Sequence, residues 1–146
     1  MRWSFLVLLV WVAIACYGEG STGVREGTTG LEIEVSQGDA FTLAPGETAH
    51  VGGTEVLIHF DRVTEDSRCP TDVQCPWQGN AAVRLEVSSR IAEFAPQPVV
   101  LNTGIEPRER AILGITVRLV DVDPVPRAAD PPIDPTRYRV ELTVTR

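Results

Sequence analysis

Apolar and polar residues alternate along most of the chain beyond residue 30. Leu31, Ile33 and Val35 alternate with two glutamates, and the same period of two recurs in later segments. These segments are residues 41–43, 56–60, 83–87, 99–101, 112–122 and 138–144. A period of two is typical of half-buried strands, and the many β-branched residues favour the same structure. We find no apolar stripe of helical spacing over a useful length.

Short turns separate these segments. Ser36 to Asp39, Pro45-Gly46 and Gly52-Gly53 all carry turn-forming residues. Strands at ~8–12-residue spacing with such turns are typical of an antiparallel β-sandwich or a small barrel. We therefore predict an all-β domain over residues 31–146, with about seven or eight strands.

The N-terminus has the pattern of a secretory signal peptide. Arg2 supplies the positive start, and residues 5–15 form an uncharged apolar stretch. The apolar run is too short to cross a hydrocarbon core of ~30 Å, which needs ~20 helical residues. We predict a signal peptide over residues 1–15.

Two cleavage sites fit the end of this segment. Ala13-Ile14-Ala15 is an A-x-A site for ordinary signal peptidase, which would release a secreted protein. Followed by Cys16, the same residues resemble the bacterial lipobox, although Ala13 replaces the usual leucine. Acylation of Cys16 would account for the odd cysteine of an exported chain if the other two cysteines pair. In Gram-negative bacteria, an aspartate directly after the acylated cysteine marks retention in the inner membrane. This chain has Tyr17 at that position, so we expect a lipoprotein of the outer membrane or periplasm.

The residues after Cys16 are rich in glycine and polar side chains. Such a stretch cannot bury apolar surface and is expected to be a flexible coil. We predict that residues 16–30 form a lipid-anchored tether with a reach of about 20 Å.

Composition excludes one class of partner. The chain has 146 residues, room for one domain, and a formal net charge of −7 with no lysine. An acidic protein repels phosphate backbones, so we do not expect a nucleic-acid partner.

A cysteine-containing stretch stands between two of the predicted strands. It reads Asp66-Ser67-Arg68-Cys69-Pro70, followed after a short gap by Cys75-Pro76-Trp77-Gln78-Gly79. In an exported protein we expect Cys69 and Cys75 to form a disulfide, worth roughly 2–3 kcal/mol on the chain-entropy model. A second long loop, residues 124–136, holds five prolines. Long loops in compact domains are often functional.

This motif resembles one in a group of uncharacterised bacterial exported and lipoprotein domains. In that group D-S-R-C-P and C-x-W-x-G lie between strands of a small β domain. The residues that fit are Asp66, Ser67, Arg68, Cys69, Pro70, Cys75, Trp77 and Gly79. The resemblance implies an exported β domain, and it implies no activity.

Two interpretations of the motif remain open. Asp66 can cap a turn and pair with Arg68, which gives both residues a structural role. Alternatively, Asp66, Arg68 and Trp77 form a binding loop, because arginine and tryptophan are favoured as interface anchors.

Other chemistry finds little support in the sequence. Cys69 and Cys75 with His50 or His59 would make a zinc set, but the spacing is unusual and oxidation competes for the thiols. Two aspartate-rich stretches lack the calcium-loop pattern; these are residues 61–72 and 121–134. Because no hydrolase or P-loop motif occurs, we assign no catalytic residue, metal or cofactor.

We therefore expect an exported, lipid-anchored, non-catalytic β domain that acts as a binding or structural module of the cell envelope. Its membrane contact would be the lipid on Cys16, and its partner a protein of the envelope. The alternative is a secreted inhibitor of a peptidase or lysozyme-like enzyme, since a braced loop binds with a low ordering cost. A small hydrolase is a third hypothesis.

Overall fold

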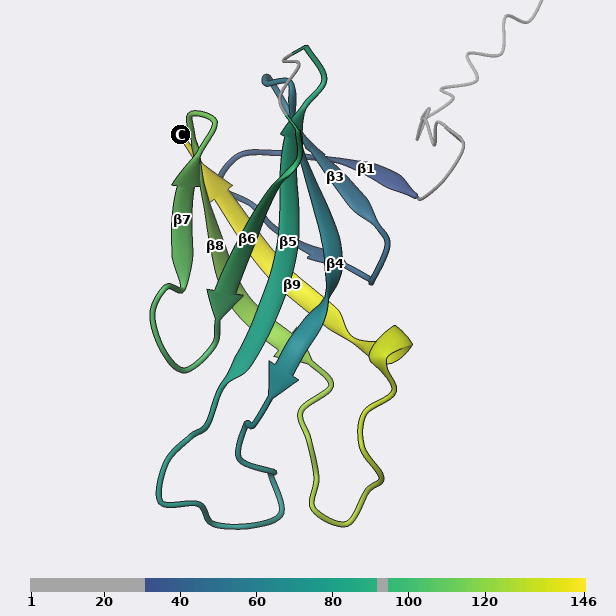
Figure 1. The fold of residues 1–146 in the computed structure, drawn as a ribbon, viewed down its shortest axis with the longest axis vertical. Coiled ribbons are helices and arrows are strands. Elements are labelled where there is room, and N and C mark those ends of the chain that lie inside the picture. The colour runs from purple at the N-terminus through teal and green to yellow at the C-terminus, as the bar shows by residue number, and fades with distance from the viewer. Residues whose placement is uncertain (1–30, 92–94) are drawn as a thin grey trace, which may run out of the picture.

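The fold is an all-β sandwich of two sheets, which confirms the predicted class (Figure 1). The computed structural model describes residues 31–91 and 95–146. The predicted signal peptide over residues 1–15, the tether over 16–30 and Cys16 therefore lie outside the described residues. The strands are β1 Glu32–Val35, β2 Ala40–Leu43, β3 Thr48–Val51, β4 Val56–Asp66, β5 Ala81–Ser89, β6 Gln97–Asn102, β7 Glu109–Ile112, β8 Ile115–Asp123 and β9 Arg139–Thr145.

The two sheets have five and four strands. One sheet has the order β1-β3-β4-β5-β6, and the other has the order β2-β9-β8-β7. All neighbouring strands are antiparallel except β1 and β3, which pair in parallel. The parallel pair differs from the wholly antiparallel sandwich that we predicted.

The described part of the chain has nine strands, one more than the upper end of the expected range. Two strands account for the difference. No predicted segment covers β3, and residues 112–122, which we predicted as one strand, are divided by a turn. Leu113 and Gly114 both have positive φ, at 50° and 78°, and they turn the chain between β7 and β8. Positive φ at both central residues is the geometry of a tight hairpin turn.

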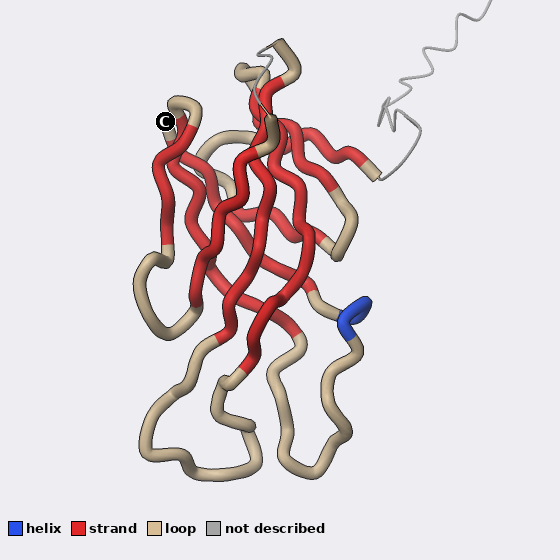
Figure 2. Tube along the Cα trace, in the orientation of Figure 1, coloured by secondary structure: helices blue, strands red, loops and turns tan. Residues whose placement is uncertain are grey.

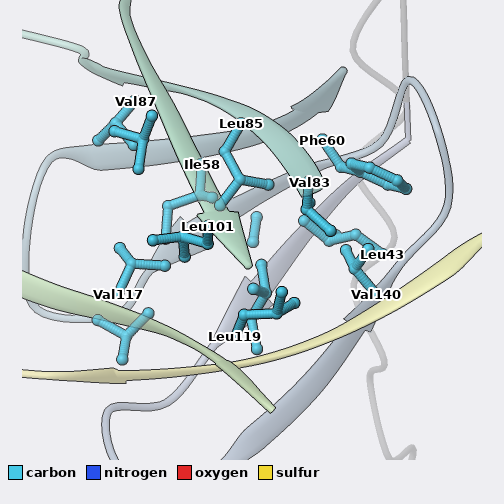
Figure 3. Packing of buried hydrophobic residues seen from close by; sticks show 14 of the residues in the cluster. Leu43, Ile58, Phe60, Val83, Leu85, Val87, Leu101, Val117, Leu119 and Val140 are labelled. Carbon is cyan, nitrogen blue, oxygen red and sulfur yellow. The ribbon is translucent and has the colours of Figure 1, made fainter. Parts of the chain in front are cut away.

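The alternating residues point into one core between the sheets (Figure 3). Its largest fully buried side chains come from both sheets and include Phe60, Ile58, Leu85, Leu119 and Leu142. Because side chains alternate across a strand, most of the buried residues have neighbours along the chain that face water.

Three loops gather at one end of the sandwich (Figure 2). The cysteine loop, residues 67–80, joins β4 to β5. The 103–108 loop joins β6 to β7, and the proline loop, residues 124–134, follows β8. A short 3-10 turn, Pro135–Arg137, connects the proline loop to β9, and the Asp134 side chain caps it by accepting from the Thr136 N–H at 2.9 Å. We call this part of the molecule the loop end.

Candidate functional site

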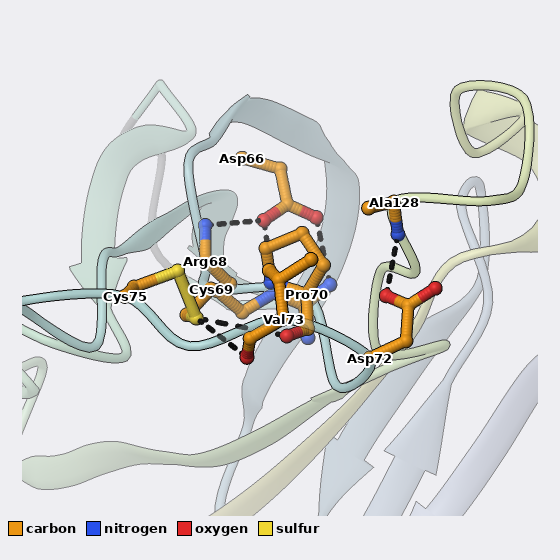
Figure 4. The surroundings of a disulfide bond; sticks show 8 residues. All are labelled: Asp66, Arg68, Cys69, Pro70, Asp72, Val73, Cys75 and Ala128. Atoms are coloured by element: carbon orange, nitrogen blue, oxygen red, sulfur yellow. Dashed lines mark hydrogen bonds and ion pairs between the residues drawn. A yellow bond between two sulfur atoms is a disulfide. The ribbon is translucent and has the colours of Figure 1, made fainter.

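The cysteine loop is closed at its base by backbone hydrogen bonds and at its tip by a disulfide. Ser67 N–H donates to the Asn80 carbonyl at 2.7 Å, and Cys69 N–H donates to the Gln78 carbonyl at 2.9 Å. These bonds continue the pairing of β4 with β5 beyond the ends of the strands. The predicted disulfide between Cys69 and Cys75 is confirmed, with Cα atoms 5.9 Å apart (Figure 4). The loop is therefore a stapled extension of the sheet.

Asp66 and Arg68 form an ion pair inside the loop end. Arg68 donates from Nε to Asp66 Oδ1 at 2.9 Å and from Nη2 to Asp66 Oδ2 at 2.7 Å. The two side chains are only 10% and 11% exposed. The same guanidinium also donates to the Val122 carbonyl, and to the Pro124 carbonyl at 2.8 Å. Arg68 thus joins the base of the cysteine loop to the end of β8 and the start of the proline loop.

Tyr138 completes this buried polar group from the other side of the proline loop. Its hydroxyl donates to Asp66 Oδ2 at 3.0 Å, and the residue is 8% exposed. Burial, together with the bond to the Asp66 carboxylate, raises the pKa of Tyr138 to about 12. Burial of Asp66 acts to raise the pKa of its carboxyl, but hydrogen bonds from Arg68 outweigh it and leave that pKa below its ordinary value.

The proline loop is also attached to the tip of the cysteine loop. Asp72 accepts hydrogen bonds from the N–H groups of Ala128, at 2.7 Å, and Ala129, at 3.2 Å. The bond from Ala128 is the main reason why the pKa of Asp72 is lowered. Thr71 N–H donates to the Pro126 carbonyl at 3.0 Å. The two long loops therefore hold each other at several points along their length, and they run side by side in Figure 1.

The 103–108 loop packs closely against the cysteine loop. Asn80 connects them, because its amide donates to Asn102 Oδ1 at 2.9 Å and its Oδ1 accepts from the Gly104 N–H at 3.0 Å. A Cβ added to Gly104 would lie 2.0 Å from the Gly79 carbonyl oxygen. A Cβ added to Gly79, whose φ is +73°, would lie 1.9 Å from the Ser67 carbonyl oxygen. Glycine at both positions permits this close approach of the backbones.

Exposed apolar side chains gather on these braced loops. Trp77 is 74% exposed, and it is accompanied by Val73, Ile105 and Val125, which are 42–58% exposed. We call these four residues the apolar rim. They make up half of the large hydrophobic residues that are exposed within the described part of the chain. Isolated exposed hydrophobic residues are ordinary, whereas their grouping on preorganised loops is typical of an interaction site.

The structure therefore separates the residues of the predicted binding loop. Asp66 and Arg68 lie inside, where they brace the loops, and Trp77 alone faces outward. Ile105 and Val125 carry no signal in the sequence, because the close approach of three loops distant in sequence is not visible there.

The cavities of the loop end include the following two. The larger, of about 610 Å³, lies against the proline loop and is lined by residues that include Asp66, Arg127, Arg137 and Tyr138. The smaller, of about 300 Å³, lies between the cysteine loop and the 103–108 loop, where Gln78, Thr103 and Arg108 line it.

The contacts of the described residues give no support to the zinc and calcium hypotheses. The disulfide occupies both thiols of the zinc set. His50 Nε2 lies 2.7 Å from the Thr54 carbonyl oxygen, and His59 Nδ1 lies 3.1 Å from Thr48 Oγ1. Over residues 31–91 and 95–146, no three histidine, cysteine or acidic side chains come together as a group that could hold a metal ion. The same residues include no helix of the length and apolar character needed to cross a bilayer.

Comparison with known proteins adds no family to this description. No protein-family model matches the chain, and neither a curated protein nor a solved structure shows significant similarity to it. The function is therefore inferred from the loop end itself.

Proposed function

We propose that this chain is an exported, lipid-anchored, non-catalytic binding module of the bacterial cell envelope, and that it captures a protein partner at its loop end. The observation that carries the proposal is the exposure of Trp77 on a loop held by a disulfide, backbone bonds and a buried ion pair. Large aromatic side chains are the commonest anchors of protein interfaces. A braced loop loses little conformational freedom when it binds, which favours affinity.

The position of the loop end supports a tethered module. The described chain begins with β1 near the end of the sandwich that lies away from the three loops (Figure 1). A lipid on Cys16 with a tether over residues 16–30 would therefore leave the loop end directed away from the membrane. Mass spectrometry of the mature protein tests the anchor: an acylated N-terminal Cys16 is expected. A mature protein without acyl chains would support the secreted alternative.

Substitution of Trp77 by alanine tests the binding role. The full chain with a C-terminal affinity tag is extracted from envelopes in mild detergent, and the retained proteins are quantified by mass spectrometry. A protein retained by the wild type should fall by about 30-fold with Trp77→Ala, the loss typical of an interface hot spot. The melting temperature should hardly change, because an exposed side chain contributes within about 0.5 kcal/mol to stability.

Ile91 provides the matched control. It is 79% exposed and lies beyond the end of β5, away from the loop end. Ile91→Ala should retain the same proteins as the wild type. Equal retention by Trp77→Ala and Ile91→Ala would contradict the proposed binding surface.

Inhibition of a peptidase or lysozyme-like enzyme is the second candidate function. It is supported by the same feature, since an aromatic side chain on a braced loop suits insertion into an enzyme cleft. Incubation with a panel of peptidases and muramidases tests it, and the inhibition should disappear with Trp77→Ala. A panel without inhibition would remove this candidate and leave the envelope partner.

A further inference from the structure

Arg108 is the arginine of the loop end whose buried nitrogen has no partner. It precedes β7 directly, and its Nε is buried without a hydrogen bond in the described part of the chain. None of the ion pairs formed by residues 31–91 and 95–146 includes it. Arg84 Nε also lacks a hydrogen bond, but it lies 3.1 Å from Asp61 Oδ2 and is thereby paired electrostatically. Among the hydrogen bonds of the described residues, Arg108 donates only from its backbone N–H, so the charged end of its side chain is also without a protein partner.

The side chain of Arg108 lines the smaller cavity, of about 300 Å³. This volume is at the lower limit of small-molecule sites and suits a single side chain rather than a large ligand. Arg68 lines the same cavity, but Asp66 and the carbonyls of Val122 and Pro124 occupy its donors. Arg108 is therefore the cation that a ligand in this cavity would meet.

Two neutral polar side chains line the cavity together with Arg108. Thr103 Oγ accepts from the Ala81 N–H at 2.8 Å, which leaves the hydroxyl hydrogen free to donate. The Gln78 amide donates to the Gly104 carbonyl over a long distance of 3.5 Å, so a stronger acceptor can replace that partner. Arg108, Thr103 and Gln78 thus each place a hydrogen-bond donor on the lining of this cavity.

The charge of the ligand is limited by Asp121, which also lines the cavity. Its Oδ1 accepts from the Val122 N–H at 2.7 Å, and no ion pair joins it to Arg108. A carboxylate close to the site repels a dianion more strongly than a monoanion. The planar guanidinium fork matches a carboxylate in a bidentate arrangement.

We propose that this cavity, which we call the Arg108 pocket, binds the side-chain carboxylate of a glutamate or aspartate on the protein partner. The proposal rests on the function proposed above, and it specifies which chemistry the partner presents. Trp77 directly precedes Gln78 of the pocket. An acidic residue next to an apolar residue would therefore fit the two features together, with the apolar residue against Trp77.

A titration with acetyl-glutamate amide, followed by ¹H–¹⁵N NMR of the ¹⁵N-labelled full chain in detergent micelles, tests the pocket. The Nε–H signal of Arg108 and the backbone amides of Gln78 and Gly104 should shift along a saturable curve. The dissociation constant should be on the order of 1–10 mM, as expected for one charged contact. Acetyl-glutamine amide, which lacks only the charge, should produce no shift at these positions.

Two variants and a control locate the binding. Arg108→Gln should abolish the shifts, and Arg108→Lys should weaken binding because lysine keeps the charge and loses the planar fork. Arg110→Gln, at an exposed position of β7, should bind as the wild type does. The backbone of Arg108 keeps its bonds to Glu106 and Leu119 in every variant, so the amide spectrum should remain that of the folded wild type.

Several outcomes would overturn the proposal. These are an absence of shifts in the wild type, equal shifts with acetyl-glutamine amide, and unchanged binding by Arg108→Gln. Tighter binding of inorganic phosphate at the same amides would make the pocket a phosphate site instead.

The two proposals fail separately. Suppose that acetyl-glutamate amide binds and that this binding depends on Arg108. If Trp77→Ala and Ile91→Ala then capture the same envelope proteins, the pocket is kept and the proposed binding function is rejected. If the wild type does not bind acetyl-glutamate amide but Trp77→Ala loses the captured proteins, the binding function is kept and the carboxylate site in the Arg108 pocket is rejected.

Discussion

Replacement of Arg68 by alanine tests whether this residue braces the loop end from within. The substitution removes both hydrogen bonds to the Asp66 carboxylate and the bonds to the carbonyls of Val122 and Pro124. Asp66 is then left almost buried, with the Tyr138 hydroxyl and the backbone N–H of residue 68 as its remaining donors. A carboxylate that loses its cation in such surroundings is strongly destabilising.

The magnitude follows from the burial of the pair. Removing one partner of a buried ion pair costs about 3–5 kcal/mol. The side chains of Arg68 and Asp66 are 10% and 11% exposed, so solvent screens their interaction little. The donors that Asp66 retains favour the lower end, and we expect a loss of about 3 kcal/mol in the free energy of unfolding. For a domain of roughly 100 residues this lowers the melting temperature by about 10–15 °C.

Urea denaturation followed by circular dichroism measures this loss. Arg62→Ala is the control, because Arg62 also pairs with an aspartate, at 2.8 Å, but its side chain is 56% exposed. Exposed pairs are worth about 0.2–1 kcal/mol, so the control should remain close to the wild type. Equal stability of the two variants would refute the bracing role. If the cost arises from the unpaired carboxylate, Asp66→Ala combined with Arg68→Ala should also be more stable than the sum of the single changes predicts, by at least about 1 kcal/mol.

Four further predictions concern the same end of the molecule. Gly79→Ala should prevent normal folding of the loops, because its Cβ would meet the Ser67 carbonyl oxygen. Gly38 is the control, because it also has a positive φ but lies in open space; Gly38→Ala should lower the stability measured by urea denaturation by only about 1 kcal/mol. The raised pKa of Tyr138 predicts stability that is complete below pH 10 and is lost as the pH rises through about 12; Tyr138→Phe should lack this loss in thermal melts across that range. The lowered pKa of Asp66 has the opposite sign, so its contribution is present above pH 3.8 and is lost on further acidification, and Arg68→Ala should reduce this acid dependence. Reduction of the loop disulfide should cost about 2 kcal/mol in denaturation experiments and weaken partner capture. Unchanged capture would show that the backbone bonds, the ion pair and Asp72 brace the loop without the disulfide.

Much of the sandwich could be predicted because burial acts directly on the side-chain pattern. Phe60 and Leu85 belong to alternating segments, and both lie fully buried in β4 and β5. Alternation specifies which face of a strand is buried, but it does not specify the neighbouring strand, so the parallel pairing of β1 with β3 was not visible. The β7–β8 hairpin was missed because Leu113, an apolar residue without turn preference, occupies a positive-φ position inside an apolar run.

The candidate site could be predicted only where its contacts are local. Cys69 and Cys75 are close in sequence, and the exported context was sufficient to predict their bond. The partners of Arg68 in β8 and the proline loop are more than fifty residues away, so both of its possible roles remained open in the sequence. Arg108 carried no signal at all, because its significance is the absence of a partner in the folded chain.

The bonds inside the loop end and the residues on its surface are parts of one arrangement. The disulfide closes the tip of the cysteine loop, Arg68 fixes its base, and Asp72 attaches it to the proline loop. Because these restraints form when the chain folds, the ordering cost of the apolar rim is met before any partner arrives. Changes to the brace should therefore reduce stability and affinity together, whereas changes to Trp77 should reduce affinity alone. That difference distinguishes a binding surface from loops that are braced only for stability.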